Sequence, residues 1–91
     1  MTPLLLASWL STQLWTWDAV PNATAYRVYW SRIVNEWCTT NMREFPATVC
    51  KDGECQGFIP KPTWKLTFFV VTAVNAFGES PTEHGEIRVC P

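Results

Sequence analysis

Apolar and polar residues alternate along several short segments of this chain. In Gln13–Ala19, Trp15 and Trp17 share one face while Leu14 and Thr16 share the other. A period of two residues is the signature of a β-strand, in which successive side chains point to opposite faces of the sheet. The segment therefore predicts a strand with its tryptophans turned toward a core.

The same period occurs in two further segments and divides each into an inward and an outward face. The inward residues are Tyr26, Val28 and Trp30 in Tyr26–Arg32, and Phe69, Val71 and Ala73 in Leu66–Asn75. The outward residues are Arg27, Tyr29 and Ser31 in the first segment, and Phe68, Val70 and Thr72 in the second.

Seven Pro and four Gly separate these short segments, and no stretch has the spacing of an amphipathic helix. Further strands are expected at Leu4–Trp9, Glu36–Thr40, Ala47–Cys50, Cys55–Ile59 and Glu86–Cys90. Many short strands with turns at regular spacing are typical of an all-β sandwich. The 91 residues suffice for one domain, so the prediction is a single domain over residues 1–91, a seven-stranded antiparallel immunoglobulin-like β-sandwich.

Two segments carry a family resemblance. Residues 15–30 (WTWDAVPNATAYRVYW) and 69–81 (FVVTAVNAFGESP) resemble strands B and C, and strand F with the FG loop, of a fibronectin type III module. The resemblance implies that Trp17 and Tyr26 are core aromatics. One departure is that Thr67 stands where the family usually has a tyrosine that closes the EF corner, and Trp64 is expected to cap this corner instead.

Composition and charge exclude several classes of function. The chain is 47% hydrophobic with a net charge of −1, which excludes a disordered chain and leaves no basic stripe for nucleic acid or anionic lipid. No apolar run reaches the roughly 20 residues of a membrane span. We therefore expect neither nucleic-acid binding nor membrane insertion.

The sequence lacks the residue arrangements that enzyme catalysis usually requires. His84 is the only histidine, and no nucleophile or carboxylate stands beside it at a recognisable catalytic spacing. The glycines are isolated, so no phosphate-binding loop is present. The sequence indicates a non-enzymatic protein without a cofactor.

The four cysteines favour disulfides over a zinc site, because neither Cys38 nor Cys90 has a partner two residues away and the only close pair is Cys50-x4-Cys55. Asp52-Gly53 is a strong signal for a type I′ hairpin, which would place Cys50 opposite Cys55. By elimination Cys38 would pair with Cys90, although other connectivities remain open. Disulfides imply an extracellular or virion-surface location.

Candidate binding residues come from turns and from aromatics expected at the surface. In this fold the turns at Pro21–Thr24, Lys51–Glu54 and Asn75–Ser80 gather at one end, and Phe77 is an unusual turn residue unless it docks on a partner or folds back. The predicted binding residues are Asn22, Asp52, Asn75, Phe77, Tyr29, Trp37 and Trp64. Asn22-Ala23-Thr24 also matches the N-glycosylation pattern, with a polar turn as the simpler interpretation.

Together these observations predict a non-catalytic module that binds a protein outside a reducing cytoplasm. A short chain that starts with Met1 and has no secretory signal fits a virion surface component, such as a capsid decoration or tail protein. One alternative is an adhesion or receptor module from a longer cell-surface protein. Another is a small carbohydrate-binding module that uses Trp37 and Trp64.

Overall fold

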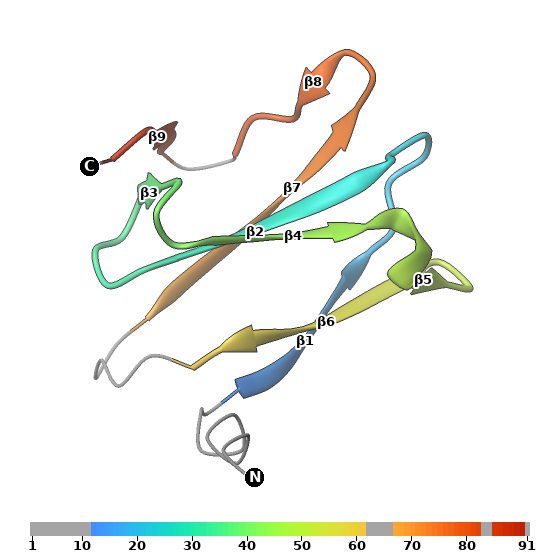
Figure 1. Cartoon of the computed structure of the whole chain (residues 1–91), viewed down its shortest axis with the longest axis horizontal. Helices are drawn as coiled ribbons and strands as arrows, with labels where there is room; N and C mark the ends of the chain where they lie inside the picture. Colours follow the sequence, from blue (N-terminus) through green and yellow to red (C-terminus); the bar gives the residue numbers. More distant parts are fainter. Residues whose placement is uncertain (1–11, 62–66, 83–84, 91) are drawn as a thin grey trace, which may run out of the picture.

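The strands of this protein stack in three layers (Figure 1). The structure is a computed structural model that describes residues 12–61, 67–82 and 85–90. Its strands are β1 (Thr12–Asp18), β2 (Ala25–Ser31), β3 (Glu36–Cys38), β4 (Met42–Pro46), β5 (Cys50–Lys51), β6 (Glu54–Pro60), β7 (Phe68–Asn75), β8 (Gly78–Glu79) and β9 (Glu86–Arg88). A short 3-10 turn, Ala47–Val49, is the only helical element among these residues, and none of them forms a helix able to span a membrane.

The first two layers are antiparallel sheets. The first sheet has the order β1-β6-β5 and the second the order β4-β2-β7-β8. In the second sheet β2 lies between β4 and β7, so Tyr26 faces Phe45 on one side and Ala73 on the other. The all-β, antiparallel character predicted from the sequence is confirmed.

Aromatic rings fill the space between the two sheets. Trp15 of β1 contacts Phe69 of β7, with ring centroids 4.1 Å apart. Trp17 lies 5.7 Å from the ring of Tyr26 and 5.6 Å from that of Phe45. Such tilted pairs are a preferred arrangement of aromatic side chains. The inward faces predicted for β1, β2 and β7 are therefore those that meet in the core.

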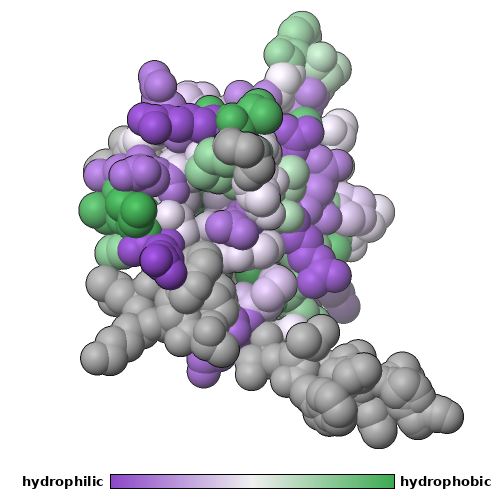
Figure 2. Space-filling model, turned by 60° about the vertical axis from the view of Figure 1, so that its left-hand side comes forward, coloured by the Kyte–Doolittle hydropathy of each residue, from purple (hydrophilic) through white to green (hydrophobic). Residues whose placement is uncertain are grey.

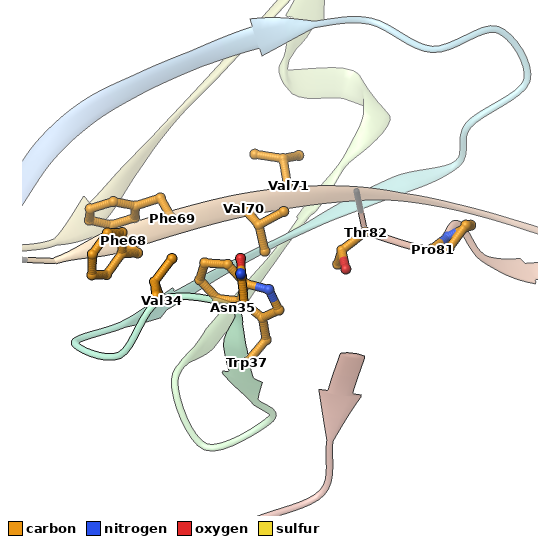
Figure 3. Close-up of a pocket in the computed structure, with 9 residues that line it drawn as sticks. All are labelled: Val34, Asn35, Trp37, Phe68, Phe69, Val70, Val71, Pro81 and Thr82. Carbon is orange, nitrogen blue, oxygen red and sulfur yellow. The ribbon is translucent and has the colours of Figure 1, made fainter. Parts of the chain in front are cut away.

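The third layer is a ribbon of β3 and β9, which pair in parallel. Strand β3 belongs to an excursion in which the chain leaves the second sheet after β2 and returns at β4, and the Trp30 N–H closes its base by donating to Asn41 O at 3.1 Å. Strand β9 follows β8 in the sequence and pairs with β3. In the close-up, Trp37 of β3 lies on one side of β7 and Val71 on the other, the side of β1 (Figure 3). The ribbon therefore covers the face of the second sheet that points away from the first sheet.

The ribbon corrects the predicted strand count, because the described residues form nine strands in three sheets rather than seven strands in two. The predicted strand Ala47–Cys50 is mostly the 3-10 turn that follows Pro46, with only Cys50 in β5. Strand β4 was not predicted, because the charged residues Arg43 and Glu44 at its centre obscure the alternation of apolar and polar residues that would have indicated the inward-facing Phe45. The predicted strand Leu4–Trp9 lies outside the described residues.

Candidate functional site

Three turns lie toward one end of the two main sheets, the β1–β2 and β5–β6 turns at the right of Figure 1 and the β7–β8 turn at its top. The Ala19 N–H donates to Gly53 O at 2.9 Å, which joins the β1–β2 turn to the β5–β6 hairpin. The Thr24 N–H donates to Val74 O at 2.7 Å, which joins the same turn to the end of β7. We call these turns, residues 19–24, 51–54 and 75–80, the loop end. Backbone hydrogen bonds connect the three turns, so the loop end is one connected surface rather than a set of independent loops.

The β7–β8 hairpin extends furthest from this end. Asn75 pairs with Gly78 across a two-residue loop, and the Phe77 N–H donates to the Asn75 side-chain oxygen at 2.8 Å. Through that bond the side chain of Asn75 stabilises its own turn, as Asn and Asp side chains often do. In Figures 1 and 2 the hairpin projects from the top of the body, with hydrophobic green at its tip in Figure 2.

Phe77 is the most exposed large apolar residue among those described, at 99% of its full accessible surface. It does not fold back over its own domain, which was the alternative expected from the sequence. Val20 of the neighbouring turn is 47% exposed and lines, with Phe77, a shallow hollow of about 230 Å³. An aromatic ring held wholly in water beside further apolar surface is the kind of feature that marks an interaction site.

Two other predicted binding residues also lie at the loop end. Asn22 has φ 67° and Asp52 has φ 54°, and both side chains are exposed. With Gly53 at φ 85°, Asp52 forms the expected type I′ turn, and Lys51 pairs with Glu54 as predicted. The structure therefore brings Asn22, Asp52 and Phe77 to the same end.

Two aromatic residues that were predicted to bind at the surface are buried in the structure. Tyr29 has no exposed surface and Trp37 is only 4% exposed. The physical reason is the β3–β9 ribbon, which covers the outer face of β2 and β7 and buries its own tryptophan there. Trp37 therefore cannot serve as a sugar-binding platform. Trp64 and His84 lie outside the described residues.

A charged cluster that the sequence did not reveal supports the β7–β8 hairpin. Glu79 of β8 accepts hydrogen bonds from Tyr29 Oη at 2.6 Å, from Thr72 Oγ1, and from Arg27 Nη1 at 2.9 Å. Arg27 also donates to Glu44 at 2.8 Å. The side chains of β2 and β7 thus hold the carboxylate of β8 next to the exposed turn, while Glu44 of β4 holds Arg27.

The titration of this cluster follows from its contacts. Burial raises the pKa of Glu79, but the hydrogen bonds from Thr72, Tyr29 and Arg27 outweigh it, so the pKa lies below its usual value of 4.5. Burial, together with the bond to Glu79, raises the pKa of Tyr29 to about 12. The hydrogen bond to Glu44 is the main cause that raises the pKa of Arg27. At neutral pH the cluster therefore contains a carboxylate, a guanidinium and a neutral phenol.

The structure joins Cys38 to Cys90 and Cys50 to Cys55, the pairing that the sequence favoured. The first bond connects the ribbon strands β3 and β9 near their ends, and the second links β5 to β6. Their Cα atoms are 5.5 Å and 3.8 Å apart. Two disulfides are compatible with an oxidising, extracellular environment.

Within the part of the chain that the structure describes, no cluster of three or more His, Cys, Asp or Glu residues is arranged to hold a metal ion. The feature that stands out is the loop end, where a braced hairpin presents Phe77. No protein family model, curated protein or solved structure matches this chain.

Proposed function

We propose that this protein is a non-catalytic binding module of the fibronectin type III kind, which docks on a partner protein through its loop end. The observation that carries the proposal is the 99% exposure of Phe77 on a hairpin held by hydrogen bonds. Burying a phenyl ring from water contributes about 1.5–3 kcal/mol, and aromatic residues are enriched where proteins bind each other. A docked partner would recover this free energy.

The arrangement of the two main sheets supports the family assignment. Without the ribbon, the sheets β1-β6-β5 and β4-β2-β7-β8 hold seven strands among the described residues. The three turns expected to cluster in that family are linked here by the bonds from Ala19 to Gly53 and from Thr24 to Val74. On this interpretation the β3–β9 ribbon is an addition to the family's sandwich, made of β3, which lies between β2 and β4 in the sequence, and β9, which follows β8.

The disulfides support a site of action outside a reducing cytoplasm. Cytosolic thiol systems keep cysteines reduced, whereas secreted and virion-surface domains retain such bonds. The Cys38–Cys90 bond closes a loop with a sequence separation of 52. In a reducing compartment the ribbon would lose this constraint.

For the setting we propose a virion surface, as a capsid decoration or tail protein. Such proteins pack as many copies on a lattice, and copies that are linked to one another attach firmly through contacts that are individually small. The exposed ring of Phe77, on a hairpin fixed by hydrogen bonds, is suited to such a contact. Binding to purified particles, compared with binding to intact cells, distinguishes this setting from a receptor or adhesion module.

Site-specific photo-crosslinking tests the docking surface. The photoreactive analogue p-benzoyl-phenylalanine replaces Phe77 in one variant and Phe58 in a matched control. Phe58 is also exposed, at 59%, but lies on β6, away from the β7–β8 hairpin. We expect a discrete protein adduct on particles or cells from position 77 and none from position 58. Adducts from position 58 alone, or from neither position, would contradict the proposal.

A further inference from the structure

The molecule carries an apolar pocket as well as an exposed ring. The pocket measures about 510 Å³ and lies between the ribbon and the outer face of β7. Its lining includes Val34, Trp37, Phe68 and Val70, with the polar groups of Asn35 and Thr82 at its side (Figure 3). Volumes of 300–1,000 Å³ with mostly apolar walls and few polar groups are typical of binding pockets.

The mouth of this pocket is apolar too. Val34 is 54% exposed and its neighbour Ile33 is 50% exposed. Both lie in the turn between β2 and β3, and Val34 also lines the pocket, so a ring that enters beside it would contact an aliphatic side chain. Most of the residues that line the pocket have apolar side chains and none is charged, so the pocket suits an uncharged side chain better than an ion.

The ring and the pocket stand at opposite ends of β7. Phe68 begins this strand and Asn75 ends it just before Phe77. Strands rise about 3.3 Å per residue, so about 13 Å of extended chain separates Val71, the last lining residue of β7, from Asn75. A molecule cannot place its own Phe77 in its own pocket, but a second copy can.

We propose that Phe77 of one copy inserts into the pocket beside Trp37 of the next copy, so that the chain self-associates head to tail. This inference rests on the proposed function, since it identifies the partner of the loop end as a second copy of the chain. When two copies associate in this way, one copy keeps a free pocket and the other keeps a free Phe77 ring. The assembly therefore extends into rows or closes into a ring, as a repeating surface layer requires. A contact made by one side chain is small, and small interfaces form transient complexes.

Complementary variants test the arrangement. Phe77→Ala removes the ring and leaves the pocket, while Val34→Glu places a charge at the pocket mouth and leaves the ring. Sedimentation velocity from micromolar to millimolar concentration should show the average mass of the wild type rising. Each variant alone should remain a monomer. An equal mixture should form a two-chain complex and nothing longer, because only one ring and one open pocket remain to meet.

Matched controls and a second measurement keep the test decisive. Phe58→Ala and Leu14→Glu alter exposed apolar residues of the first sheet and should self-associate like the wild type. If Val34→Glu does not fold, the amide chemical shifts of the wild type on dilution replace it, and they should change near Phe77 and near Val34. A wild type that stays monomeric at millimolar concentration overturns the inference, as does a Phe77→Ala variant that still associates. If the wild type is monomeric but position 77 crosslinks another protein, the inference fails while the proposed function stands.

Discussion

Replacing Trp17 tests the core on which the loop end is built. Its ring lies 5.7 Å from Tyr26 and 5.6 Å from Phe45, so Trp17→Ala removes contacts to both β2 and β4. Core Trp→Ala changes cost about 3–5 kcal/mol, and because Trp17 is half-buried we expect the lower end, about 3 kcal/mol. For a domain of this size that corresponds to a melting temperature lower by about 12–24 °C.

The second half of this test separates the ring from its polar atom. The indole N–H of Trp17 is buried and has no hydrogen-bond partner among the described residues. Trp17→Phe keeps an aromatic ring and removes that unpaired donor, so it should cost only about 1 kcal/mol. Thermal unfolding followed by circular dichroism, with the disulfides intact, measures both variants. A Trp17→Ala protein that melts within a few degrees of the wild type would refute the placement of β1 against the second sheet.

Three further predictions concern other parts of the structure. Gly57→Ala should lower stability by about 1–3 kcal/mol in urea unfolding, because the added methyl would lie 2.5 Å from the ring of Phe45. Glu79→Gln should cost about 1–3 kcal/mol at neutral pH, as expected for lost charge-assisted bonds. Because the folded state lowers the pKa of Glu79, the wild type should lose this advantage as the pH drops below 4.5, so unfolding curves of the two proteins should converge in acid. Replacing Cys38 and Cys90 with serine should cost about 4 kcal/mol on the chain-entropy estimate for a separation of 52, measured by the same unfolding curves; no loss of stability would contradict a constrained ribbon.

The parts of the fold that the sequence predicted well depend on neighbours in the chain. The period of two placed Trp15, Trp17, Tyr26 and Phe69 on the faces that now meet in the core. The type I′ signal of Asp52-Gly53 set the register of its hairpin and with it the position of two cysteines. These features follow from local backbone preferences, which a single sequence records directly.

The parts that could not be predicted depend on contacts between distant segments. Strands β3 and β9 were both expected as strands, at Glu36–Thr40 and Glu86–Cys90, but no local pattern predicts that they pair in parallel with each other. Their pairing covers the outer face of the second sheet, which is why Tyr29 and Trp37 were expected at the surface and are buried. The single clue was the assignment of Cys38 to Cys90, which required these two segments to approach each other.

The candidate site follows the same division between local and distant contacts. Phe77 was identified from its place in a turn, but its exposure depends on what lies beneath it. Glu79, two residues further along, is fixed by Tyr29 and Arg27 of β2 and by Thr72 of β7. A hairpin fixed at its base in this way cannot fold back over the sheet without breaking charge-assisted hydrogen bonds, which are stronger than neutral ones. The partly buried cluster thus explains why the apolar ring of Phe77 stays exposed to water at the end of the domain.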